Sequence, residues 1–132
     1  MGPVVVDASV VIAFRDSEDA HHRAADRVLT NARKRGAHLV LPASAFAESL
    51  VHPLAAGVSE ERATQALTRV FTVEPLTSEI AVAAARLRAT TKLRLPDALV
   101  VATGMSLDAD QILTCDQGWR GTDRRVRTVG AT

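Results

Sequence analysis

The sequence predicts an α/β fold with a mostly parallel sheet, on three observations. Short runs rich in β-branched residues, such as residues 4–6, have the composition and length of buried strands. Longer segments between them repeat apolar residues every three or four positions, as amphipathic helices do. The two kinds of segment alternate along the chain without an internal repeat. Strands separated by helices are joined by right-handed crossovers, and this connection makes neighbouring strands parallel.

Five segments are expected to form strands. Each is short, apolar and bounded by polar residues or by proline, and the third is the weakest of them. The expected strands comprise residues 4 to about 7, 38–41, 73–76, 112–114 and 126–129.

Six segments are expected to form helices. Gly36 is placed to end the second helix, and Ser59 to cap the fourth. Pro53 should end or kink the third helix, whereas Pro96 suits the first position of the sixth. The expected helices comprise residues 9–14, 19–35, 43–56, 60–71, 77–91 and 96–103.

Length and composition indicate one folded domain over residues 1–132. The chain has 132 residues, of which 47% are hydrophobic, so it can build a core. Aromatic residues are only 3%, which argues against a stacking platform for single-stranded nucleic acid. Cys115 is the single cysteine, so no internal disulfide is possible, in agreement with a reducing cytosol. We see no signal-peptide pattern or membrane-spanning stretch and expect a cytoplasmic protein.

Four acids are expected to converge at one edge of the sheet. Asp7 follows the first strand and Asp116 follows the strand over residues 112–114, so both should lie at the carboxyl edge. Helices between parallel strands run back, so their N-termini lie at that edge too. This places Asp97, which follows Pro96, on the same side. Glu48 lies one to two turns into its helix, and its side chain is long enough to lean back.

Such a cluster has a chemical use. Like charges packed together repel, and some of the acids would protonate unless a cation neutralised them. Carboxylate oxygens suit Mg²⁺ or Mn²⁺, and such ions activate water and stabilise charge at a phosphoryl centre. No His-Cys spacing typical of zinc competes with this interpretation.

Each acid also has a simpler interpretation. Asp7 could only terminate a strand, Asp97 could complement a helix dipole, and Asp116 could belong to a turn. The helix after Asp97 is apolar all round, so it should be buried, and an acid at its head then needs a partner or a metal. Glu48 lies off the apolar stripe of its helix, and the helical wheel alone favours a surface acid. Ser9 and Thr114 could orient a carboxylate or a water molecule, or be a plain helix cap and a strand threonine.

With these residues in view, the chain resembles PIN domains, and most specifically VapC-type toxins of bacterial toxin–antitoxin pairs. Four short motifs carry the resemblance, which covers nearly the whole chain. Any one of them is weak, but four in order in a chain of this size are specific. They are VVDASVVIAF at residues 5–14, LPASAFAESL at 41–50, LRLPDALVVATG at 93–104 and LTCDQGW at 113–119.

The resemblance implies a PIN-like three-layer sandwich, with a parallel sheet of about five strands flanked by helices. It implies an endoribonuclease that hydrolyses phosphodiester bonds of RNA with Mg²⁺ or Mn²⁺, a homodimer, and a VapB-type antitoxin that blocks the site. It gives the catalytic and metal-binding role to Asp7, Glu48, Asp97 and Asp116. Ser9 and Thr114 take supporting hydroxyl positions beside these acids.

The phosphates of an RNA substrate would need cations outside the acid cluster. Arg94 precedes Asp97 and Arg120 follows the last motif, so we expect these two to contact RNA. We expect the remaining arginines of these regions to be solvated surface residues rather than RNA contacts. They are Arg15, Arg124, Arg125 and Arg127.

Two other kinds of protein were weighed. A phosphoacceptor receiver needs paired acids after the first strand and a late lysine, but Ala8 follows Asp7 and no lysine lies beyond Lys92. A non-catalytic PIN-like module that binds RNA or protein is the second alternative. The intact set of four acids argues against it.

Overall fold

The computed structural model, which describes residues 2–130, has a five-stranded sheet in which every neighbouring pair of strands is parallel. The strand order is β3-β2-β1-β4-β5, so β1 is central. The strands are β1 (Val4–Val6), β2 (Leu39–Pro42), β3 (Thr72–Glu74), β4 (Gln111–Thr114) and β5 (Val126–Thr128). The α/β fold and the five expected strands are confirmed.

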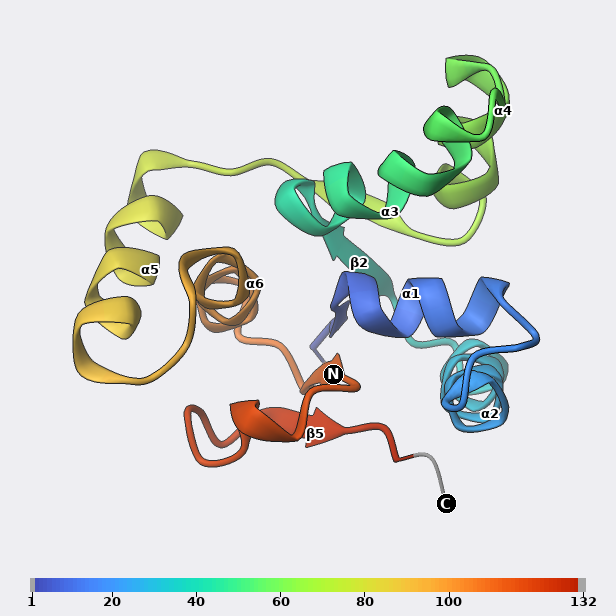
Figure 1. Ribbon diagram of the computed structural model, residues 1–132. Coiled ribbons are helices and arrows are strands. Elements are labelled where there is room, and N and C mark those ends of the chain that lie inside the picture. Colours follow the sequence, from blue (N-terminus) through green and yellow to red (C-terminus); the bar gives the residue numbers. More distant parts are fainter. Residues whose placement is uncertain (1, 131–132) are drawn as a thin grey trace.

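Six helices cover this sheet. Figure 1 shows α5 and α6 on one side of the sheet and α1 and α2 on the other, with α3 and α4 at the end of the sheet where β2 lies. The helices are α1 (Ala8–Arg15), α2 (His22–Lys34), α3 (Ala43–Ala55), α4 (Glu60–Thr68), α5 (Ser78–Thr90) and α6 (Leu95–Ser106). A short 3₁₀ helix, η1 (Gln117–Trp119), follows β4.

Several expected helix ends are wrong by up to three residues, and local hydrogen bonds explain one of them. The second helix begins at His22 rather than at residue 19, because aspartate side chains close turns in the preceding loop. Asp16 accepts from the Glu18 N–H at 2.9 Å, and Asp19 accepts from the His21 N–H at 2.8 Å. Pro53 does not end α3, which continues to Ala55 with the proline in its last turn.

The core is built on the central strands. Val4, Val5 and Val6 are all buried, and Val5 pairs in register with Val40 of β2 and Ile112 of β4. Helix α6 packs against this layer through its small and apolar residues, with Ala98 fully buried. Cys115 is half-buried just beyond the end of β4. The β-branched run therefore fixes the central strand that ends at Asp7.

Helix α3 positions its acid by bridging two other helices. It follows β2 directly at the carboxyl edge and contacts both α1 and α6. Helix α1 begins after Asp7 and α6 begins just before Asp97, so the three helices bring their acid-bearing segments to one edge. Within residues 2–130, no helix combines the length and hydropathy needed to cross a membrane.

Candidate active site

Asp7 is the most buried acid at the carboxyl edge, with 7% of its surface exposed. Its backbone N–H donates to the Leu113 carbonyl at 2.9 Å, which continues the pairing of β1 with β4. Its Oδ2 accepts hydrogen bonds from Ser9 Oγ at 2.7 Å and Thr114 Oγ1 at 3.0 Å. Burial raises the pKa of Asp7 above its ordinary value, although these two hydrogen bonds oppose the rise.

The Ser9 and Thr114 hydroxyls connect Asp7 to the segment after β4. Their oxygens lie 3.4 Å apart. Ser9 Oγ also accepts from the Cys115 N–H at 3.0 Å, and Thr114 Oγ1 accepts from the Asp116 N–H at 3.1 Å. Asp7, not Ser9, is the N-cap residue of α1. The two hydroxyls therefore fix the orientation of the Asp7 carboxylate relative to Asp116.

Asp97 lies in the first turn of α6 and is partly buried. Burial is the main cause that raises its pKa, and the charge of Asp116 raises it further. Arg94 opposes this rise, with its Nε 3.7 Å from Asp97 Oδ2. The helix dipole alone would favour the charged acid. Burial and the neighbouring acid therefore outweigh the opposing contribution of Arg94 to the pKa of Asp97.

Glu48 is largely exposed on α3, as the helical wheel suggested, yet it belongs to the same electrostatic group. Partial loss of hydration raises its pKa, and the charges of Asp7 and Asp97 raise it further. Arg94 lowers it. The three helices thus place Asp7, Glu48 and Asp97 close enough for their charges to interact.

Asp116 is exposed and has a turn role as well. It is the N-cap of η1, and its Oδ1 accepts from the Gly118 N–H at 2.8 Å. Its charge acts on Asp97, which places it on the α6 side of the cluster. The turn interpretation of Asp116 therefore holds alongside its proximity to the other acids.

The donor chemistry of this cluster fits a hard divalent cation. Its candidate ligands are all carboxylates, and a cation would relieve the repulsion and desolvation that raise the pKa values of Asp7, Glu48 and Asp97. Within residues 2–130, however, no three His, Cys, Asp or Glu side chains are already arranged to hold a metal ion. Binding would require the carboxylates to draw together.

The protonation state of Asp7 should affect the stability of the metal-free protein. An acid with a raised folded-state pKa favours folding while protonated; this contribution is present below the ordinary value of 3.8 and lost as pH rises through the folded value. The Asp7 carboxylate should therefore destabilise the metal-free protein at neutral pH. Asp7→Asn should raise the free energy of unfolding by on the order of 1 kcal/mol at pH 7 in EDTA. Urea denaturation between pH 4 and pH 8 measures this.

Asp108→Asn is the matched control of opposite sign. Arg125 lowers the pKa of Asp108 through a 2.8 Å hydrogen bond, so that charge favours folding above pH 3.8. Its variant should lose stability at neutral pH. If Asp7→Asn instead lost stability under the same conditions, the prediction would be wrong. The contacts of the Asp7 carboxylate would then stabilise its charge by more than burial destabilises it.

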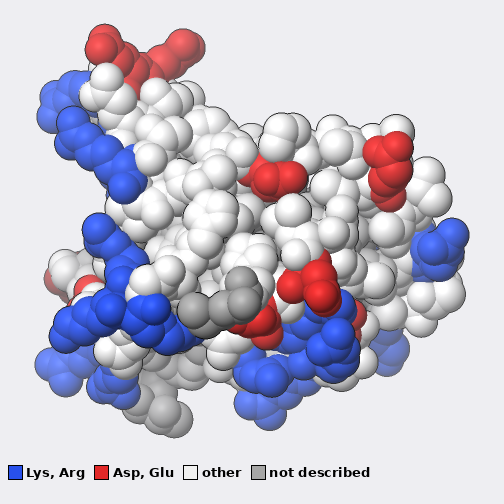
Figure 2. Space-filling model, turned by 180° about the vertical axis from the view of Figure 1, so that it is seen from behind, with Lys and Arg blue, Asp and Glu red and all other residues white. Residues whose placement is uncertain are grey.

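The arginines expected to be solvated differ in their contacts from the two expected to bind RNA. Figure 2 shows Lys and Arg side chains gathered along one side and the lower part of the face behind Figure 1. Arg125 pairs with Asp108 and Asp123, and Arg127 donates to backbone carbonyls. Arg120 contacts Thr128 Oγ1 at 3.3 Å, whereas Arg94 alone of these arginines touches an acid of the cluster.

Trp119 is a site neighbour that the sequence did not reveal. It is 1% exposed, and its Nε1 is buried without a hydrogen-bond partner among residues 2–130. The indole nevertheless lies close enough to Asp97 to lower the pKa of that acid. The signal was the position of the only tryptophan, three residues after Asp116 in the last motif.

Comparison with solved structures finds the same fold in toxins of toxin–antitoxin pairs. A toxin–antitoxin complex from Klebsiella pneumoniae matches with a TM-score of 0.80 and 22% identity, over 95% of this chain and 96% of that one. VapBC-1 from nontypeable Haemophilus influenzae matches with a TM-score of 0.73 and 17% identity, over 95% and 96%. VapC20 of Mycobacterium tuberculosis, a sarcin–ricin loop cleaving toxin, matches with a TM-score of 0.65 and 19% identity, over 83% and 86%.

The sequence comparisons give the family. No curated protein matches the chain significantly. The family model of the PIN domain matches residues 4–125, which is nearly the whole chain and includes all four motifs. Structural neighbours that are VapC toxins agree with this match. The chain therefore belongs to the PIN domain family.

Proposed function

We propose that this protein is a VapC-type toxin, an endoribonuclease that hydrolyses RNA with Mg²⁺ or Mn²⁺ and is inhibited by a VapB-type antitoxin. The observation that carries the proposal is the electrostatic coupling of Asp7, Glu48 and Asp97, with Asp116 acting on Asp97. An acid cluster at the carboxyl edge of a parallel sheet is where an open α/β fold binds its ligands. All four acids are proposed as metal ligands.

The chain's own residues would divide the work as follows. The Ser9 and Thr114 hydroxyls hold the Asp7 carboxylate in one orientation. Asp7 would therefore bind a cation without first losing side-chain freedom. Asp97, Glu48 and Asp116 complete the anionic set, and Arg94 beside Asp97 would contact a substrate phosphate. A bound divalent cation supplies positive charge for the phosphoryl oxygens and a lowered pKa for water. Hydrolysis that breaks the P–O3′ bond leaves a 5′-phosphate and a 3′-hydroxyl.

Partners are part of the proposal. Four of the structural matches have names that include a toxin and an antitoxin or the VapBC pair. This chain exposes large apolar side chains on α3 and α5, such as Val51 and Val82, which suit contact with an antitoxin or a second copy. We propose a cytoplasmic homodimer that is neutralised by the antitoxin.

The test is RNA cleavage by the purified chain, free of antitoxin. Total bacterial RNA is incubated with the protein in Mg²⁺, Mn²⁺ or EDTA, and the new 5′ ends are sequenced. We expect discrete cuts that carry a 5′-phosphate and disappear in EDTA. Folded protein that binds RNA but leaves it intact with every ion would instead support the alternative, a non-catalytic PIN-like binding module.

A further inference from the structure

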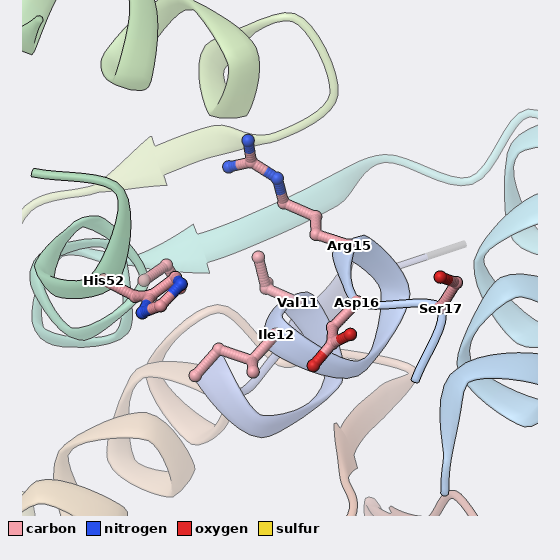
Figure 3. Close-up of a pocket in the computed structure, with 7 residues that line it drawn as sticks. Val11, Ile12, Arg15, Asp16, Ser17 and His52 are labelled. Carbon is pink, nitrogen blue, oxygen red and sulfur yellow. The ribbon is translucent and has the colours of Figure 1, made fainter. Parts of the chain in front are cut away.

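A pocket of about 570 Å³ lies between α1 and α3, beside the acid cluster. Its size is within the range of pockets that bind small ligands. Figure 3 shows Val11 and Ile12 at its centre, with His52 on one side and Asp16 and Ser17 on the other. The pocket is lined by Val11, Ile12, Arg15, Asp16, Ser17, Ser49 and His52.

The two helices that form this pocket also carry two of the acids. Val11 follows Asp7 by one helical turn, and His52 follows Glu48 by one turn. The four-residue spacing spans about 6 Å along a helix axis, at about 1.5 Å per residue. A polymer bound across the acid cluster would therefore place its neighbouring monomer at the pocket.

The surface of the pocket suits a flat, partly apolar ring. Val11 is buried and forms the floor, and Ile12 is unusually open for its type, with 46% of its surface exposed. The exposed His52 supplies the only aromatic ring of the lining. Nucleobases bind proteins by stacking on such rings and on apolar side chains.

The charges at the rim favour an anion on one side. Within residues 2–130, the exposed Arg15 has neither an ion pair nor a side-chain hydrogen bond, so its guanidinium is available to a phosphate. Asp16 is the one acid of the lining, and its Oδ1 accepts from the Glu18 N–H. A phosphate would therefore lie on the Arg15 side.

We propose that this pocket is a nucleotide subsite, which holds the base of the RNA nucleotide next to the scissile bond. The base lies over Ile12 against the His52 ring, and Arg15 binds a phosphate. The position beside the scissile bond rests on the proposed function, whereas nucleotide binding itself does not. The pocket would then favour some bases over others beside the cut, because bases differ in stacking strength.

Nucleotide binding can be tested without any cleavage. Each ribonucleoside 5′-monophosphate is titrated into methyl-labelled protein in EDTA and followed by NMR. We expect shifts at the Val11 and Ile12 methyls with at least one nucleotide, and none with ribose 5-phosphate. His52→Ala and Arg15→Ala should weaken binding roughly tenfold, a stacked base or a charged contact being worth that much. His52→Phe should restore it, and Arg86→Ala on the exposed face of α5 is the control.

Cleavage tests the second half of the proposal. A random RNA pool is cut by the wild type and by His52→Ala, and the bases around each cut are counted. Base preference at one flanking position should fall in His52→Ala and return in His52→Phe. Cuts with unchanged preference would overturn the subsite and leave the proposed function standing. Nucleotide binding without any cleavage would support the pocket and remove the proposed function, and equal binding of ribose 5-phosphate would overturn the pocket as a base site.

Discussion

Replacement of Asp97 by asparagine will lower the rate of metal-dependent RNA cleavage at least about 100-fold. Asp97 interacts electrostatically with each of the other three acids of the cluster. Burial and the charge of Asp116 raise its pKa, and its own charge raises the pKa values of Asp7 and Glu48. An amide cannot neutralise the proposed divalent cation, so the variant would lose charge where the proposed mechanism activates the substrate phosphate. Loss of one such electrostatic interaction with the reacting group costs several kcal/mol of transition-state stabilisation.

Glu79→Gln is the matched control for this experiment. Glu79 also lies in the first turn of a helix, α5, but it is exposed and does not contribute to the raised pKa values of the cluster. Both variants should give the circular dichroism spectrum of the wild type, and Glu79→Gln should cleave RNA at the wild-type rate. Full activity in a folded Asp97→Asn variant would exclude Asp97 from the metal site and leave the acid cluster without its central member.

The parts of the site fixed by strand ends could be predicted from the sequence. A β-branched run that stops at an acid places that acid at the sheet edge whatever the side chains around it do, as Asp7 shows. The first turn of a buried helix is equally constrained, so Asp97 could be placed from Pro96 and the apolar run after it, although α6 begins one residue earlier than expected, at Leu95. In both cases, one local signal determines the backbone position.

The rest depends on how helices pack, which local patterns do not specify. Glu48 lies off the apolar stripe of α3, and only the contact of that helix with both α1 and α6 brings it to the cluster. The pocket beside Ile12 likewise exists only because α1 and α3 pack together in the fold. The proximity of Trp119 to Asp97 could not be predicted either, because it depends on where η1 places the indole. The period of the apolar residues predicts which face of a helix is buried, but not which element packs against that face.

Gly104 offers a second large effect, because it sets how closely α6 approaches β4. A Cβ built at this position would lie 2.5 Å from Ile112 Cγ1 and closer still to Cδ1, and Ile112 is fully buried. We expect Gly104→Val to lower the free energy of unfolding by about 3 kcal/mol, since overpacking a close-packed core costs about 1–3 kcal/mol and valine regains little helix propensity. Urea denaturation in EDTA measures this loss.

The same substitution should also reduce RNA cleavage, although Gly104 touches none of the acids. It lies two turns after Asp97 on α6, so a helix pushed off β4 moves Asp97 away from Asp116, which follows that strand. The cause can be separated by a double-mutant cycle with Ile112→Ala, which removes the atoms that the new side chain would meet. If the close approach is the cause, the double variant will lose at least about 1 kcal/mol less stability than the sum of the single variants and will recover part of the cleavage rate. Additive losses of stability would mean that Gly104 acts through the backbone of α6 alone, and the spacing between α6 and β4 would then not be what positions Asp97.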